Sequence, residues 1–214
     1  MDPSTAQRPS ASHRRGYRTA KRALDIAAAI LGLVLVSWLL GLVALLIKLT
    51  SRGPVLFHQA RAGLRGRPFV LLKFRSMRVD AELVRPELAC RGEMDGPVFK
   101  MRLDPRITRL GRFLRRSSLD ELPQLVNLLL GQMSLVGPRP LPLEEARLLP
   151  PEHQRRHDVL PGLTGLWQVR GRNDLAYAEM MRLDIEYVAR CSPWLDLRIL
   201  LATVPAVLTG RGAS

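Results

Sequence analysis

The sequence predicts a mixed α/β fold that is mostly helical, with a small β-hairpin sheet and one N-terminal hydrophobic helix inserted in a membrane. Three observations lead to this fold class. An uncharged apolar run extends from Ile26 to Ile47, two β-type segments flank a Gly/Arg-rich loop, and helix-type patterns fill most of the remaining chain. At 214 residues, the chain is long enough for one globular domain beside this helix.

The charge is distributed unevenly around the apolar run. The chain has 33 Lys and Arg residues against 19 Asp and Glu, a formal net charge of +14. Residues 1–25 carry six basic and two acidic side chains, and residues 48–79 carry eight basic and no acidic ones. Residues 80–214 are nearly balanced, with 19 basic and 17 acidic side chains. The basicity therefore belongs to the flanks of the hydrophobic segment.

The 22 residues of the apolar run predict a helix of about 33 Å, which is long enough to cross a bilayer. No small-x-small cleavage site follows, which argues against a signal peptide, and no polar stripe interrupts the run, which argues against a core helix. Basic residues on both flanks favour the cytoplasm for both ends. A re-entrant helix satisfies both flanks, but it needs a break, for which Ser37 and Gly41 are weak candidates. Charge alone leaves the re-entrant and spanning arrangements open.

The composition divides the chain into four parts. We expect a disordered tail over residues 1–16, a membrane-inserted helix with basic flanks over 17–50, a cytosolic-face domain over 51–209, and a short tail over 210–214.

Turn signals and hydrophobic periodicity predict the elements of the domain. Strands are expected at residues 55–59 and 69–74, a short helix at 80–89 and a loop at 91–97. Further along, we expect a charged, exposed helix at 143–158, a turn at 161–165, a short strand at 166–169, and helices at 177–190 and 196–208.

A helix is also expected to begin near Asp120. The pair Ser118 and Glu121 has the spacing of a capping box, and an apolar face follows until Gly131. Pro123 is tolerated only where its missing N–H would be unpaired, so it should lie in the first turn. Asp120 and Glu121 would then lie at the positive end of the helix dipole, which favours ionised carboxylates.

These adjacent carboxylates lie near clustered arginines and the rigid turn that contains Arg139. A carboxylate can attack phosphorus, a neighbouring one can hold Mg²⁺ on phosphate oxygens, and arginines bind multiply charged phosphates. Because the site follows a membrane segment, a lipid phosphate is favoured over a water-soluble one. No P-loop or GxGxxG motif is present, and Cys90 and Cys191 have no CxxC spacing, which fits a reduced, cytosol-facing domain.

Several longer motifs occur in order along the chain. They are KRALD at 21–25, SRGPVLF at 51–57, KFRSM at 73–77, DPRITRLGRFLR at 104–115, SSLDELPQLVNLLLGQMSLVGPRP at 117–140, PGLTGLWQVRGR at 161–172 and LDIEY at 183–187. With these motifs, residues 18–209 resemble the bacterial sugar transferases, also called monotopic polyprenyl-phosphate phosphoglycosyl transferases, in their minimal form.

The resemblance implies transfer of a sugar 1-phosphate from a UDP-sugar to undecaprenyl phosphate, with release of UMP and a requirement for Mg²⁺. It assigns Asp120 as the nucleophile that takes up the phospho-sugar covalently and Glu121 as a metal ligand. It further implies a bacterial inner-membrane enzyme of exopolysaccharide or lipopolysaccharide synthesis, with its catalytic domain at the cytoplasmic face.

By the same resemblance, substrate phosphates would be held by Lys73, Arg75, Arg106 and Arg139, and the nucleotide or sugar would contact Gln168 and Arg172. Family members often have a Ser-Pro pair that breaks the membrane helix and makes it re-entrant. Here the pair is Ser37-Trp38, so the proline is missing.

Two other classes of function were weighed. A membrane-tethered nucleic-acid-binding module fits the high basicity, but the charge lies beside the lipid segment and only 5% of residues are aromatic, so we expect no nucleic-acid partner. A non-catalytic membrane scaffold would tolerate changes at Asp120. The sequence names neither the sugar nor the glycan pathway, and it leaves a homodimer open.

Overall fold

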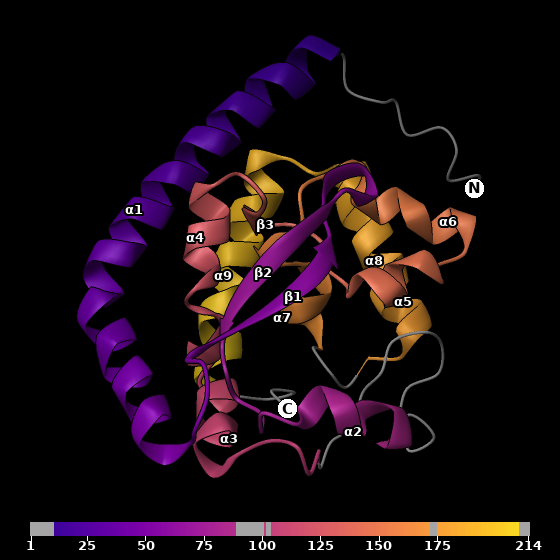
Figure 1. The fold of residues 1–214 in the computed structure, drawn as a ribbon. Coiled ribbons are helices and arrows are strands. Elements are labelled where there is room, and N and C mark those ends of the chain that lie inside the picture. The colour runs from indigo at the N-terminus through magenta and orange to yellow at the C-terminus, as the bar shows by residue number, and fades with distance from the viewer. Residues whose placement is uncertain (1–10, 89–100, 102–103, 172–174, 210–214) are drawn as a thin grey trace.

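A long helix bows around one side of the molecule. The computed structural model describes residues 11–88, 101, 104–171 and 175–209. Helix α1 (Ala11–Thr50) forms an arc beside α4 (Gln124–Leu129) and α9 (Pro193–Thr209) (Figure 1). It begins inside the stretch expected to be a tail and continues through Ser37 without an interruption. Residues 1–10 and 210–214 and the expected loop at 91–97 lie outside the described residues.

Both ends of α1 are attached to the same domain. Near its start, Arg22 donates hydrogen bonds to the carbonyl oxygens of Leu128 and Leu129, and Asp25 accepts one from the Leu135 backbone N–H. Near its end, Val43 and Ile47 are buried in a cluster with Phe74 and Leu114. The contacts thus include residues before the apolar run and the last residues of the run itself.

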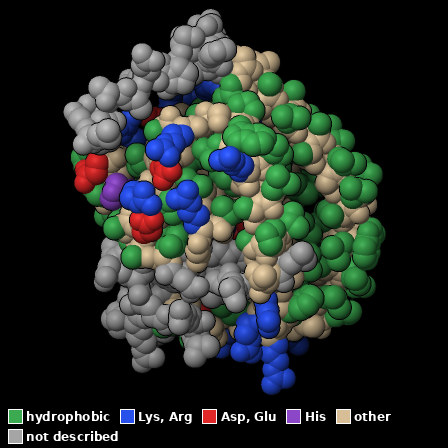
Figure 2. All heavy atoms as spheres, turned by 180° about the vertical axis from the view of Figure 1, so that it is seen from behind, with side chains coloured by type: hydrophobic (Ala, Val, Ile, Leu, Met, Phe, Trp, Pro, Cys, Tyr) green, Lys and Arg blue, Asp and Glu red, His purple; other side chains and the backbone are tan. Residues whose placement is uncertain are grey.

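The outward face of α1 is apolar and exposed. Among the described residues, one helical stretch, residues 16–50, is long and apolar enough to cross a membrane. Its exposed large side chains are Leu24, Ile30, Leu31, Val34, Leu35, Trp38, Leu42, Leu45, Leu46 and Leu49. Figure 2, which views the molecule from behind, shows hydrophobic side chains along the edge where α1 lies, while Lys and Arg gather elsewhere. This exposure excludes the core-helix interpretation and supports membrane association.

The predicted β-hairpin is confirmed. Strands β1 (Leu56–Ala62) and β2 (Pro68–Phe74) pair antiparallel, with Leu56 opposite Phe74, and both lie in the centre of the fold (Figure 1). A 3₁₀ turn at Leu64–Gly66 joins them, where Arg65 (φ 56°) and Gly66 (φ 71°) have left-handed backbone angles. The strands extend further toward this turn than predicted, which shortens the Gly/Arg loop.

A second, two-stranded parallel sheet pairs β3 (Ser134–Val136) with β4 (Gly162–Thr164). The expected turn at 161–165 therefore contains a strand, and the expected strand at 166–169 is wrong. Those residues begin helix α7 (Leu166–Arg170), because Leu166 and Trp167 are both buried in the main core. A strand would have sent two consecutive side chains to opposite faces.

Three of the remaining helices agree with the sequence predictions. Helices α2 (Ala81–Leu88), α8 (Tyr177–Arg190) and α9 match their predictions, and α3 (Arg109–Arg116) precedes the carboxylate pair. The single exposed helix expected at 143–158 is wrong. Pro150 and Pro151 divide it into α5 (Leu143–Arg147), α6 (Pro151–Gln154) and a 3₁₀ turn at Arg155–Asp158, and Glu145, Arg156 and His157 are buried.

The capping box at Ser118 is also not formed. Ser118 has a left-handed backbone (φ 57°), and its side chain makes no capping hydrogen bond. A 3₁₀ turn at Leu119–Glu121 follows it, and α4 begins only at Gln124, after Pro123. Gly131 (φ 77°) ends the segment as predicted. The carboxylates therefore lie on a tight turn between two helices, where Ser118 redirects the chain.

Candidate active site

The carboxylate pair lines a large cavity. Its volume is about 720 Å³, and its walls come from the β1–β2 hairpin, the 3₁₀ turn of Asp120, residues 139–142, α7 and α9. The predicted site residues that line it are Lys73, Arg75, Arg106, Asp120, Glu121, Arg139 and Gln168. Arg172 lies outside the described residues. Folding thus brings together candidates that are nearly 100 residues apart in the chain.

Asp120 has a buried carboxylate with only 6% of its residue surface exposed. Within the described part of the chain, no group donates a hydrogen bond to it or pairs with it as an ion. Burial raises the pKa of the Asp120 carboxyl above its ordinary value; Lys73 opposes this shift, and neighbouring Glu121 adds to it. The direction is opposite to the one expected from a helix terminus, because desolvation is the larger effect.

Glu121 is in the opposite electrostatic environment. Lys73 Nζ lies 2.8 Å from its Oε1, and Arg139 Nη2 lies 2.6 Å from the same atom. Burial alone would raise the pKa of Glu121, but Arg139 and Lys73 outweigh it, so the pKa lies far below its ordinary value. Glu121 is therefore ionised, and both cations bond one of its two oxygens.

The carboxylate oxygens of Asp120 and Glu121 could hold a magnesium ion together with phosphate oxygens of a substrate. Glu121 Oε2 has no hydrogen-bond partner among the described residues, and the Asp120 carboxylate is equally unbonded. Over those residues no group of three His, Cys, Asp or Glu side chains forms a metal cage. Mg²⁺ in phosphate-transfer sites is usually bound through one or two carboxylates plus substrate phosphates, and two carboxylates fit that pattern.

Arg75 and Arg106 face the cavity but also hold the fold together. Arg75 Nη2 donates to Ser51 Oγ at 2.6 Å and to the Ser51 carbonyl at 3.1 Å, which joins β2 to the end of α1. Its buried Nη1 has no partner among the described residues. Arg106 pairs with Asp104 at 2.6 Å and donates to the carbonyl of Ala81. Much of the charge of Arg106 is therefore already neutralised by protein.

Arg115 is a cavity residue that the sequence did not distinguish from its neighbours. Its Nε donates to Ser76 Oγ at 2.9 Å, and its charge acts on Asp120. On the same helix, Arg109, Arg112 and Arg116 are exposed. The signal was present in the spacing, because Arg115 follows the buried Gly111 and Leu114 and so shares their inner edge of α3.

Gln168 lies on α7 at the far wall of the cavity. Its Nε2 donates to the carbonyl of Leu163 at 3.2 Å, while its buried Oε1 has no partner in the described chain. The indole N–H of neighbouring Trp167 is buried without a partner in the same way. One acceptor and one donor are thus left for a polar ligand at this wall.

Comparisons with known proteins give one consistent set of relatives. A family described as bacterial sugar transferase matches residues 16–210. The chain is 47% identical over 203 residues to the UDP-glucose:undecaprenyl-phosphate glucose-1-phosphate transferase of Caulobacter vibrioides, covering 90% of this chain and 71% of that protein. It is 44% identical to the galactosyl transferase CpsE of Streptococcus agalactiae and 41% identical to the exopolysaccharide production protein ExoY of Rhizobium meliloti.

The relatives differ in length from this chain. The CpsE match covers 94% of this chain but 45% of that protein, whereas the ExoY match covers 91% of this chain and 88% of that protein. The chain therefore corresponds to less than half of some relatives and to nearly the whole of others.

Proposed function

The chain belongs to the bacterial sugar transferase family, and from this premise we propose that it transfers a sugar 1-phosphate from a UDP-sugar to undecaprenyl phosphate, releasing UMP. The names of its relatives support this substrate pair. The observation that carries the proposal is the buried carboxylate of Asp120, which has no partner among the described residues and lies in a cavity lined by Lys73, Arg115 and Arg139.

Asp120 is the proposed nucleophile. One of its oxygens bonds to the phosphorus that bears the sugar, and the bond from that phosphorus to the bridging oxygen breaks, so UMP leaves. The phosphate oxygen of the lipid acceptor then attacks the same phosphorus, which releases Asp120 and forms the diphosphate-linked sugar. The raised pKa of Asp120 makes its ionised form more basic and hence a stronger nucleophile.

Glu121 and its cations organise the charge around that step. Lys73 and Arg139 keep Glu121 ionised, and Arg115 and Arg139 place positive charge near the phosphates. When bound, Mg²⁺ would neutralise phosphate charge, with Glu121 and the substrate phosphates as its ligands. The other walls of the cavity supply further substrate contacts. Arg75 and Arg106 are proposed to contact the phosphates, and Gln168 the nucleotide or sugar.

The chain is proposed to act at the cytoplasmic face of the bacterial membrane, with α1 re-entrant. Both ends of α1 contact one domain, and basic residues flank both ends of the apolar run. The bow of α1 takes the place of the kink that a Ser-Pro pair would supply (Figure 1). The apolar outer face then lies in lipid beside the acceptor.

The test is release of UMP from a UDP-sugar with undecaprenyl phosphate and Mg²⁺. Asp120→Asn is nearly isosteric and removes the nucleophile, so UMP release should fall by at least about a thousandfold. With a UDP-sugar radiolabelled in the sugar and no acceptor, wild-type protein should retain label after acid quenching, and Asp120→Asn should not.

The control is Asp158→Asn, which changes an exposed carboxylate on the 3₁₀ turn and should keep wild-type turnover. Near-normal turnover by Asp120→Asn would exclude it as the nucleophile. An active wild-type enzyme that never acquires label would indicate direct transfer to the acceptor instead.

A further inference from the structure

The segment that carries Arg139 has little conformational freedom of its own. Pro138 and Pro140 fix their backbone φ angles and have no N–H, and a residue before proline is restricted to extended conformations. The position of Arg139 therefore depends on how the segment of Pro138, Arg139 and Pro140 as a whole is held against the cavity. Because Arg139 bonds Glu121 at 2.6 Å, a small shift of the segment would change the charge next to the reacting carboxylates.

Four hydrogen bonds hold this segment in place. Backbone groups supply two of them, from Gly137 N–H to the Thr164 carbonyl and from Gly162 N–H to the Pro138 carbonyl, both at 2.9 Å. Side chains supply the other two. Arg156 Nη2 donates to the Arg139 carbonyl at 2.7 Å, and Arg61 Nη1 donates to the Pro140 carbonyl at 2.8 Å.

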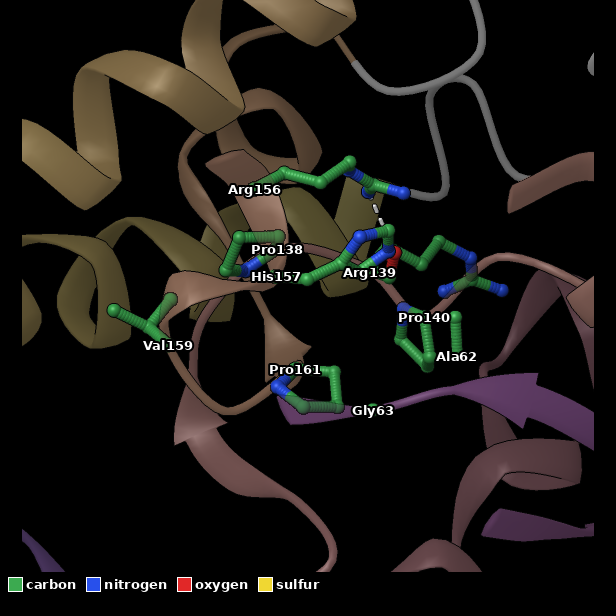
Figure 3. A pocket seen from close by; sticks show the side chains of 9 residues that line it. All are labelled: Ala62, Gly63, Pro138, Arg139, Pro140, Arg156, His157, Val159 and Pro161. Carbon is green, nitrogen blue, oxygen red and sulfur yellow. Dashed lines mark hydrogen bonds between the residues drawn. The ribbon is translucent and has the colours of Figure 1, made fainter. Parts of the chain in front are cut away.

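Arg156 is the donor that acts on Arg139 itself, and it is almost fully enclosed. Its side chain is 2% exposed, and its Nη2 and Nε lie 2.6 and 3.1 Å from Oδ2 of Asp184, which is 1% exposed. Figure 3 shows Arg156 lying against the segment, with its hydrogen bond to Arg139 dashed, while the Arg139 side chain extends away from it. Asp184 lies on α8, so the pair connects that helix to the rim of the cavity.

A buried ion pair of this kind is not explained by stability. Removing two charges from water costs about as much as their attraction returns, and apolar residues of similar volume often serve equally well. Here Arg156 Nη1 and Asp184 Oδ1 are buried without partners among the described residues, so the pair is not fully compensated. An apolar pair could fill the same volume, but it could not donate to the Arg139 carbonyl.

We propose that Arg156 and Asp184 are positioning residues, which fix the backbone of Arg139 and thereby the place of its guanidinium beside Glu121. Asp184 orients the guanidinium of Arg156, and Arg156 in turn holds the carbonyl of Arg139. The pair touches neither substrate nor the reacting atoms. The inference rests on the proposed function for its kinetic consequence, but its structural consequence can be measured separately.

The test is a double-mutant cycle in the full chain. Arg156→Met with Asp184→Leu replaces the pair by apolar side chains, and it should lower kcat/KM for UMP release by about 10- to 100-fold. Arg139→Ala should lower kcat/KM in the wild-type background and by less than about twofold in the Met/Leu background. Losses that multiply would show that the pair does not act through Arg139 and would overturn the proposal.

The matched control is the exposed pair on the same helix. Arg182 and Glu179 are 2.7 Å apart at side-chain exposures of 58% and 40%, so Arg182→Met with Glu179→Leu makes the same chemical change without contact to the segment. This control should keep wild-type kcat/KM. If the Met/Leu variant of the buried pair fails to fold, Arg156→Met with Asp184→Asn carries the same cycle, because it also removes the donor and leaves no buried charge.

A readout without activity separates this proposal from the proposed function. Amide hydrogen exchange in a peptide that covers residues 137–147 should become at least about tenfold faster in the Met/Leu variant and stay unchanged in the Arg182/Glu179 control. Unchanged exchange in both variants would overturn the positioning role. If the wild type releases no UMP, the proposed function fails, and the exchange measurement still decides the role of the pair.

Discussion

Two neighbouring side chains, Asp120 and Glu121, have acquired opposite properties from their surroundings. Burial without a partner raises the pKa of Asp120, whereas two cations on one oxygen lower the pKa of Glu121. Sites that use two carboxylates in different roles commonly separate their pKa values in this way. The separation supports the proposal that Asp120 attacks the phosphorus while Glu121 stays ionised.

Lys73 favours the ionised form of both carboxylates, so its removal should change the pH profile. In Lys73→Met, the pKa values of Asp120 and Glu121 should both rise, because each loses a nearby positive charge. The ionised forms then appear only at higher pH. The acidic limb of the kcat/KM profile for UMP release should therefore move upward by at least about one pH unit.

Arg67→Met is the control for this profile, because Arg67 is an exposed residue on the same hairpin. The Arg67→Met substitution should leave the acidic limb of the kcat/KM profile at its wild-type pH. An acidic limb that is identical in wild type and Lys73→Met would contradict the electrostatic role given to Lys73.

At the residue scale, the sequence predicted the centre of the site better than its edges. Asp120, Glu121, Lys73 and Arg139 meet as expected, because their motifs occur on segments that pack together. The bonds from Arg75 to Ser51 and from Arg106 to Ala81 could not be predicted, since both are tertiary contacts. Arg115 could not be singled out from the sequence, because five arginines lie within 11 residues and only the orientation of α3 shows which of them faces the cavity.

At the element scale, the site depends on how closely α3 approaches the end of β2. Gly111 of α3 lies against the backbone of Ser76, and Thr108 both begins the helix and donates a backbone hydrogen bond to Ser76. A Cβ at position 111 would lie 1.8 Å from the Ser76 carbonyl oxygen. The helix can therefore occupy this place only with glycine at the contact, and this contact aligns Arg115 with the cavity.

Gly111→Ala should lower both stability and activity, because the clash is with backbone and cannot be relieved by a side-chain rotation. We expect a loss of about 1–3 kcal/mol, in the range of other overpacked core sites, and a lower melting temperature in detergent micelles. Gly41→Ala on α1 is the matched control, since no atom lies within 4 Å of its added Cβ. Equal melting temperatures for the two variants would refute the close packing of α3.

Elements were predictable where the periodicity was local and strong. Tyr177–Arg190 is an amphipathic helix with clear limits and was predicted at its observed bounds. The strand predicted for the α7 segment was wrong because Leu166, Trp167 and Val169 also occur in strands. Burial of the adjacent residues Leu166 and Trp167 in the core favours a helix. The prediction for residues 143–158 was wrong because their charge suggested exposure, whereas Arg156 is buried in an ion pair with Asp184.

At the scale of the whole molecule, α1 and the domain form one unit. Tyr17 and Lys21 both bond Asp196 of α9, at 2.7 and 2.6 Å, and Arg75 bonds Ser51 just beyond the other end of the helix. Anchors to one domain on both sides of the apolar run support the proposed re-entrant arrangement, in which both ends of α1 face the same side of the bilayer. The charge pattern alone left this arrangement open.

Cysteine labelling tests the arrangement. In a background with Cys90 and Cys191 replaced by serine, Arg18→Cys and Arg52→Cys should both resist a membrane-impermeant thiol reagent added outside intact cells. Both positions are exposed on the protein surface, so both should react after the cells are permeabilised. Labelling of only one of them in intact cells would mean that α1 spans the membrane.

The glycines around the paired β3 and β4 strands fix how closely the backbones of residues 137, 162 and 165 approach one another. A Cβ on Gly162 would lie 2.1 Å from the Gly137 backbone nitrogen, and one on Gly165 would lie 2.3 Å from the Gly137 carbonyl oxygen. Since no larger residue fits at either glycine, this sheet can reshape the cavity only through the side chains that line it, which are Leu135, Leu163 and Thr164. Efforts to redesign the proposed sugar selectivity should therefore begin with these three side chains and with the lining residues of α7 and the hairpin.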